Sequence, residues 1–255
     1  MKKHRVLWLS STLAAWAALA LVAASPALAD KVAVVTEEMA PYNFIDEKDK
    51  SVKGLSTELV HEILKRASID YQIEIFPWAR SYRMAQENPN VAIYSMGRNE
   101  EREKMFKWVG IIVNREVFLY KLKGRPEVKA ASVAELKSYK LGGIRDGVRT
   151  MYLKKEGLTV EEATDDASNL KKLQSKRIDA FPIDEPNLVY LSEKNGVDFD
   201  SMERLLKLEK MSGGLYMAFS IKTPDETVEK CRAALDSMVK DGTFNKITAK
   251  WLKKK

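Results

Sequence analysis

The chain reads Ile178-Asp179-Ala180-Phe181-Pro182-Ile183-Asp184 over seven residues, an apolar strand pattern that ends in a carboxylate. Before it, Leu170 and Leu173 recur at helical spacing. After it, residues 186–195 form a second helical pattern, which Gly196 closes. The stretch therefore predicts a helix, a buried strand and another helix in succession, an order typical of a sheet covered by helices.

The same alternation extends in both directions along the chain. Further strands are predicted at 31–36, 71–76, 91–95, 140–144 and 215–220. Further helices are predicted at 55–67, 80–86, 100–105 and 147–157, and from 224 to the break at Gly242. Ser132 and Thr223 each begin a capping-box pattern, with Pro224 at the first helical position. These segments predict an α/β protein whose sheets are covered on both faces.

Residues 1–29 have the pattern of a cleaved signal peptide. A basic start at 2–5 precedes an apolar run at 6–22, and Ala-Leu-Ala at 27–29 is a small-x-small cleavage site. The competing interpretation is a transmembrane anchor, but the apolar run is at the short limit for spanning a bilayer and the cleavage site follows it. We therefore expect a soluble, exported protein that begins at Asp30.

Composition excludes several classes of function. The leader holds three of the 43 Lys and Arg and none of the 36 acids, so the mature chain has a net charge of +4, well interleaved. Nucleic-acid binding normally requires clustered basic residues, so we expect none. His61 is the one mature histidine, and no ligand set for a metal or other cofactor is recognisable. Cys231 stands alone, so no intrachain disulfide is expected.

Three motifs together resemble a known family, the type II periplasmic solute-binding proteins of amino-acid ABC importers (family 3). They are Arg102 followed by Phe106, the stretch 178–184, and the tail from Asp241-Gly242 through Ile247 to Trp251. The resemblance covers essentially the whole mature chain. It implies a two-lobed type II periplasmic-binding-protein fold, with two sheets flanked by helices.

The resemblance also implies how the chain divides between the lobes. The signal peptide is residues 1–29, lobe one is 30–118 plus 217–255, and lobe two is 119–216. Two extended crossings, near 117–121 and 214–218, would form the hinge. The implied function is that of a monomeric periplasmic protein that closes around a small ligand. It would deliver that ligand to an inner-membrane ABC permease.

Charge chemistry indicates how such a protein would hold an amino acid. A guanidinium grips a carboxylate through two parallel charge-assisted bonds, and Arg102 matches the family arginine in that role. Its alternative is a solvated helix arginine. Asp184 follows an apolar strand, where its carboxylate can accept from the ligand ammonium. Its alternative is a helix cap before Pro186.

Further binding residues are expected around these two. Aromatic walls are predicted from Tyr42, Phe44, Trp78 and Tyr94, each with a core role as its alternative. In lobe two, free amides at a helix start would meet the carboxylate, and the helix here opens Gly147-Val148-Arg149 where the family usually has Gly followed by Ser or Thr.

Extra positive charge is expected near the mouth of the cleft. Its sources are Arg98, Arg145 and Arg149, which leave room for an acidic amino acid or another small carboxylate. We therefore expect a carboxylate-bearing ligand, with its identity open.

Two other functions stay open alongside transport. Although a non-enzyme is expected, the family resemblance includes periplasmic dehydratases of the cyclohexadienyl type. In that case Glu37, Glu58 or Glu185 would transfer a proton. The chain could also report closure to a membrane receptor acting as its partner.

Overall fold

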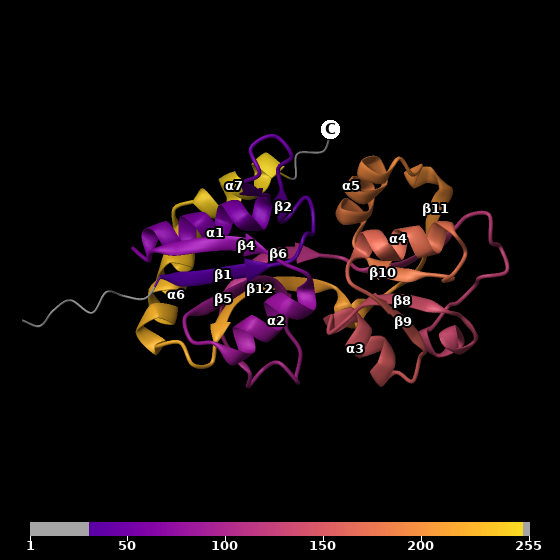
Figure 1. Ribbon diagram of the computed structural model, residues 1–255, viewed down its shortest axis with the longest axis horizontal. Coiled ribbons are helices and arrows are strands. Elements are labelled where there is room, and N and C mark those ends of the chain that lie inside the picture. The colour runs from indigo at the N-terminus through magenta and orange to yellow at the C-terminus, as the bar shows by residue number, and fades with distance from the viewer. Residues whose placement is uncertain (1–30, 252–255) are drawn as a thin grey trace, which may run out of the picture. The chain divides into compact units, whose positions relative to one another are not determined.

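The computed structural model describes residues 31–251. The predicted signal peptide lies outside these residues. None of the helices within them combines the length and the apolar character that crossing a membrane demands. The described part is mixed α/β, and Figure 1 shows its two groups of strands, each with its own helices.

The first sheet has five strands in the order β4-β1-β5-β12-β6. They are β1 (Val32–Thr36), β4 (Tyr71–Ile75), β5 (Val91–Gly97), β6 (Phe106–Arg115) and β12 (Gly213–Ser220). Strand β1 runs parallel to β4 and β5, whereas β12 is antiparallel to β5 and β6. The interior strand β5 is buried at every position but its last, as expected for a strand covered on both faces.

Helices cover both faces of this sheet. They are α1 (Leu55–Arg66), α2 (Trp78–Glu87), α6 (Asp225–Lys240) and α7 (Thr243–Trp251). Apolar residues of α1, α6 and α7 form one core with the sheet, and those of α2 form the other. A two-residue ribbon, β2 (Phe44–Ile45) with β3 (Val52–Lys53), precedes α1. We call this sheet with its helices the first lobe.

The second group of strands lies between β6 and β12 in sequence. Strands β10 (Phe181–Ile183), β7 (Phe118–Leu122) and β11 (Met202–Lys207) form an antiparallel sheet, and β8 (Leu141–Ile144) pairs in parallel with β9 (Val160–Ala163). A bridge from Leu141 to Ala180 connects the two. Helices α3 (Val148–Lys155), α4 (Asp166–Gln174) and α5 (Glu185–Asn195) accompany them, with 3₁₀ turns η1 (Val133–Ser138), η2 (Phe199–Ser201) and η3 (Glu209–Met211). We call this group the second lobe.

The chain passes between the lobes twice. The first passage lies between the end of β6 at Arg115 and the start of β7 at Phe118, and the second leads from η3 into β12. Ser212 Oγ accepts a hydrogen bond from the Val117 amide at 3.0 Å, so the two passages contact each other. The lobe limits at 118/119 and 216/217 stay a prediction.

The structure contradicts three local predictions, namely the helix at 100–105 and the two capping boxes that begin at Ser132 and Thr223. Residues 100–105 form turns instead of a helix, because Asn99 Oδ1 accepts from the Arg102 amide and the chain must extend into β6 at Phe106. Ser132 donates to the Glu135 carboxylate and does not cap an amide. Before α6, Pro224 is the N-cap residue and no side chain caps the helix.

Candidate functional site

A small cavity of about 20 Å³ lies between the lobes, a volume that would hold about one water molecule. The first lobe contributes Glu37, Met39, Trp78, Ser95, Gly97, Arg102 and Arg115 to its lining. The second lobe contributes Ile144, Gly147, Val148 and Arg149. Some of these residues end a strand or directly follow one, as Glu37, Gly97 and Arg115 do, and polar groups there can face a cleft. Others begin a helix, as Trp78 and Val148 do.

Arg102 is a fully buried cation in this lining. It donates to the carbonyl oxygens of Gly97 at 2.9 Å and Asp146 at 2.8 Å. Its guanidinium lies over the rings of Tyr82 and Trp78, at 4.7 Å and 5.3 Å from their centroids. Among the described residues it has no carboxylate partner, and its buried Nε has no acceptor. Arg102 can therefore still take a carboxylate as a counter-ion.

The N-terminus of α3 reaches the same cavity from the second lobe. Gly147 is the N-cap, and no side chain caps the helix. The first bond along the helix runs from the Met151 amide to Gly147 O, so the amides of residues 148–150 have no acceptor within the helix. Free amides at a helix start bind anions, which makes this end a second donor set for a carboxylate.

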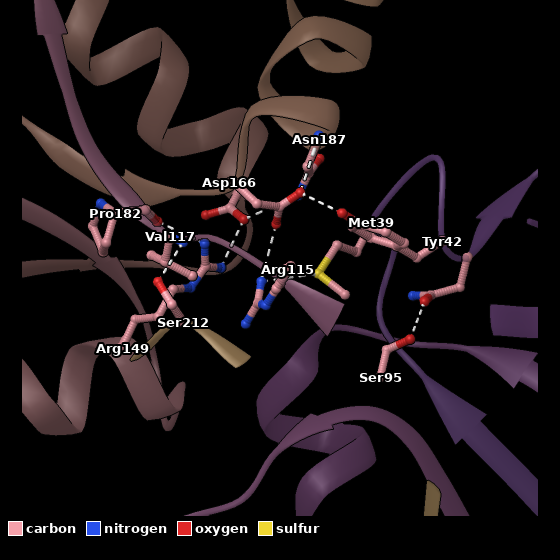
Figure 2. A network of polar contacts seen from close by, with 12 residues as sticks. Met39, Tyr42, Ser95, Arg115, Val117, Arg149, Asp166, Pro182, Asn187 and Ser212 are labelled. Atoms are coloured by element: carbon pink, nitrogen blue, oxygen red, sulfur yellow. Dashed lines mark hydrogen bonds and ion pairs between the residues drawn. The ribbon is translucent and has the colours of Figure 1, made fainter. Parts of the chain in front are cut away.

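Arg149 is also buried in the lining, but it already has an anionic partner. Its guanidinium contacts the Asp166 carboxylate at 2.8 Å and donates to the Pro182 carbonyl at 2.6 Å (Figure 2). Burial alone would lower the pKa of Arg149, but the facing Asp166 carboxylate reverses this, and the net shift is upward. Arg149 therefore stays a cation whose charge Asp166 neutralises.

Asp184 lies at the interface between the lobes but outside the lining of the cavity. Its carboxylate accepts from Tyr42 Oη at 2.9 Å and pairs with Arg115 at 3.0 Å. It also caps α5 by accepting from the Asn187 amide at 3.2 Å. The helix-cap alternative is thus the arrangement found. These three donors leave Asp184 little capacity to accept from a ligand ammonium.

Glu37 lines the cavity directly after β1, and it was considered from sequence only as a proton-transfer residue. The side chain is partly buried, and within residues 31–251 its carboxylate has no hydrogen-bond or ion-pair partner. Burial raises the pKa of Glu37 to about 7, and Asp166 reinforces the rise. Arg149, Arg115 and Arg102 oppose it. The signal in the sequence was an acid directly after the first buried strand.

The remaining predicted site residues divide into two groups. Trp78 reaches the cavity and donates from Nε1 to the Asp146 carbonyl at 2.9 Å, so it connects the lobes. Tyr94 does not, because it is fully buried in the first-lobe core with its hydroxyl 2.9 Å from Thr57 Oγ1. Phe44 packs on Tyr190 and lies outside the cavity.

Arg98 and Arg145, the other two arginines expected at the mouth, also contact acids. Arg98 pairs with Glu103 at 2.5 Å and lies over the Trp108 ring, away from the cavity. Arg145 is 3.4 Å from the Glu162 carboxylate. Each of these arginines thus contacts an acid that sequence spacing did not identify, although Arg145 shares Glu162 with Lys154.

Larger hollows exist elsewhere on the described surface. One of about 340 Å³ is lined by Arg98 together with Tyr152, Lys155 and Lys210. Its lysines are exposed and contact acids, as Lys155 does with Glu100 and Lys210 with Glu156. Exposed pairs of this kind are screened by water and bind ligands weakly. The buried charges of the small cavity make it the stronger candidate site.

The folding stability of the protein should depend on pH through Glu37. Its pKa in the folded state, about 7, exceeds the ordinary 4.5, so the folded state holds the proton more tightly. Stability is then greatest below about pH 4.5 for this group and is lost as pH rises through about 7. We expect the free energy of unfolding, measured with urea, to fall between about pH 5 and about pH 8. The fall in wild type should exceed the fall in Glu37→Gln by about 1–2 kcal/mol.

A matched variant separates this effect from the general titration of the surface. Glu47 is exposed in the same segment, and Glu47→Gln should keep the wild-type pH dependence. The Asp166, Arg149, Arg115 and Arg102 charges that face Glu37 remain in both variants. Equal pH profiles for wild type and Glu37→Gln would contradict a protonated Glu37 in the folded protein.

The arrangement defines a class of protein: a two-lobed receptor with the type II periplasmic-binding-protein fold and a polar cavity between its lobes. The chain belongs to the bacterial extracellular solute-binding proteins, family 3, whose family model matches residues 32–254. A comparison with curated protein sequences found no match.

Solved structures share the fold at low sequence identity. An ancestral arginine-binding protein bound to arginine is 22% identical, with a TM-score of 0.74, over 87% of this chain and 98% of that one. The arginine-, lysine-, histidine-binding protein ArtJ from Geobacillus stearothermophilus is 18% identical, with a TM-score of 0.74, over 88% and 96%. A histidine kinase sensor domain is 17% identical, with a TM-score of 0.77, over 88% and 96%. At these identities the likeness establishes the fold alone.

Proposed function

We propose that this protein is an exported receptor that captures a free amino acid between its lobes and delivers it to an ABC permease. The observation that carries the proposal is the convergence of two carboxylate-binding devices on one cavity. Arg102 comes from the first lobe, and the uncapped start of α3 comes from the second. A carboxylate held by both would join the lobes. Family membership and an arginine-binding structure of the same fold support the proposal that this carboxylate belongs to an amino acid.

Closure of the lobes is the step that would turn binding into a signal for the permease. Contacts between the lobes already centre on one backbone group, the Asp146 carbonyl, which accepts from both Trp78 and Arg102. The Tyr42–Asp184 hydrogen bond adds a second connection. We propose that residues 30–118 plus 217–255 move against 119–216 as rigid bodies about the two passages, as in other hinged receptors. Residues 1–29 would direct export and then be removed.

The dehydratase alternative keeps one specific observation in its favour. Of the three glutamates considered, Glu58 contacts Lys250 and Trp251, and Glu185 pairs with Arg204, all outside the cavity. Glu37 lines the cavity with a pKa near 7, which suits a general acid. In that case the same cavity would transform its ligand instead of releasing it to a permease.

One experiment tests both functions. The mature protein is unfolded, freed of carried solutes by dialysis, refolded, and melted against a panel of amino acids, other small carboxylates and prephenate. A ligand at about 100 times its Kd should stabilise the protein by about 2.7 kcal/mol. A selective amino acid supports the receptor, and catalytic consumption of prephenate supports the enzyme. A flat panel from well-folded protein overturns the amino-acid proposal.

A further inference from the structure

The charges around the cavity nearly all neutralise one another within the protein. Arg149 is matched by Asp166 at 2.8 Å, and Arg115 is matched by Asp184 at 3.0 Å. All four side chains are at least nine-tenths buried, so these pairs are shielded from solvent. Such pairs are hard to separate, because removing one partner leaves the other charge buried and alone.

Among the described residues, Arg102 and Glu37 are the two charged groups of the lining without a direct ion-pair partner, although each stabilises the charge of the other across the cavity. Arg102 contacts carbonyl oxygens, a methionine sulfur and the side chains of Trp78 and Tyr82, none of which is an anion. Glu37 has neither a hydrogen bond nor an ion pair through its carboxylate. The cavity therefore presents one cation and one carboxyl group that can ionise, and both come from the first lobe.

We infer that Glu37 accepts the ammonium of the ligand, and that the ligand is an amino acid with an uncharged side chain. The inference rests on the proposed function, because it assigns the second charged group of the same ligand. An α-ammonium and an α-carboxylate together carry the two charges that Glu37 and Arg102 lack. Once both are engaged, no charged group of the lining is left over.

Asp184, the residue expected from sequence for the ammonium, is already committed elsewhere. Tyr42, Arg115 and the Asn187 amide occupy its carboxylate, and its side chain is fully buried. An ammonium at Asp184 would have to displace Tyr42 or break the Arg115 pair. Glu37 needs no such exchange, because its carboxylate is free and faces the cavity.

The pairing of charges in the lining also indicates that the side chain of the ligand is uncharged. An acidic side chain would bring a second anion, but Arg149 and Arg115 are already neutralised by their own acids. A basic side chain would need a second free carboxylate, and the lining holds Glu37 alone. The remaining lining is apolar or small, with Met39, Ile144 and Val148. An unmatched charge beside these groups would lose its hydration without compensation.

The test is isothermal titration calorimetry on the stripped mature protein, which measures the Kd of each ligand in a panel. The panel is glycine, alanine, serine, leucine, glutamine, aspartate, glutamate, lysine and arginine. The tightest ligand is then compared with its deaminated analogue, the same carboxylate with hydrogen in place of the ammonium. Wild type should prefer the amino acid over this analogue by about 10- to 100-fold. In Glu37→Gln the preference should shrink to a few-fold, and the analogue should bind both proteins alike. Glu47→Gln, an exposed change of the same kind, should match wild type.

The outcomes separate this inference from the function on which it rests. A neutral amino acid as the best ligand, with its ammonium preference lost in Glu37→Gln, supports both parts. Tightest binding of aspartate, glutamate, lysine or arginine keeps the receptor function but overturns the uncharged side chain. An unchanged ammonium preference in Glu37→Gln overturns the role of Glu37. If no amino acid binds, the proposed function fails and the inference fails with it.

Discussion

Replacing Arg102 with alanine should weaken amino-acid binding by on the order of 100- to 1,000-fold. The guanidinium is fully buried, and its Nε has no acceptor among the described residues. A ligand carboxylate would gain charge-assisted bonds that no neighbouring side chain could supply instead. In Arg102→Ala the carboxylate would be buried without its cation, which costs more than the lost bonds alone. Calorimetry with the best ligand of the panel measures the change.

Two further variants show whether charge or geometry is responsible. Arg102→Lys keeps the cation but lacks the planar fork, so it should recover only part of the affinity. Arg83 is exposed on α2, outside the cavity, and Arg83→Ala should bind as wild type does. Loss of Arg102 also leaves the Gly97 and Asp146 carbonyls without this donor, so circular dichroism must show that the variant is folded. Affinity within about threefold of wild type in Arg102→Ala would place the carboxylate elsewhere.

Replacing Gly97 with alanine should hinder closure and weaken binding by about 10- to 100-fold. Gly97 ends β5 in the first lobe, and Val148 begins α3 in the second. A Cβ at Gly97 would lie 2.7 Å from Val148 Cγ1, a distance that real Cβ atoms essentially never show. Either the Val148 side chain must shift or the lobes must stay further apart, and the β-branched valine has few alternative rotamers. Small-angle X-ray scattering with saturating ligand should report a larger radius of gyration than that of liganded wild type.

A second substitution on the facing helix tests this contact directly. Val148→Ala removes the methyl group that the new Cβ would meet, so Gly97→Ala with Val148→Ala should regain most of the lost affinity. Gly124→Ala is the matched control, because a Cβ there has no atom within 4 Å. If the double variant bound no better than Gly97→Ala, the steric explanation would be wrong.

The fold could be predicted from sequence because its signals are local. The short apolar runs of β1, β5 and β10 and the helical spacing in α1 can each be recognised from a few neighbouring residues. Predictions of secondary structure failed where the conformation of a short segment depends on contacts with residues far away in sequence. Residues 100–105, for example, have helical composition but form turns that place Arg102 against the Asp146 carbonyl of the other lobe.

The site could be predicted only in part, because charge compensation depends on long-range pairing. Arg102, Trp78 and the start of α3 line one cavity, and their binding of a ligand stays a prediction. Whether a charged side chain already has a partner within the protein cannot be predicted in the same way. Tyr42 and Asp184 are 142 residues apart in sequence, and Arg115 and Asp184 are 69 apart. No spacing rule shows that such partners meet, so the contacts of Asp184 with Tyr42 and Arg115 could not be predicted from sequence.

The Asp146 carbonyl connects the lobes through a backbone atom, which affects how the sequence can drift. Trp78 and Arg102 both donate to this oxygen, so neither bond depends on the identity of the side chain at 146. What matters there is the left-handed backbone, with φ of 57°, which Asn, Asp and Gly adopt most readily. Homologues could therefore exchange residue 146 among these types and keep the contact. Exchange at Trp78 or Arg102 would remove a donor, so substitutions should accumulate unevenly on the two sides of the cleft.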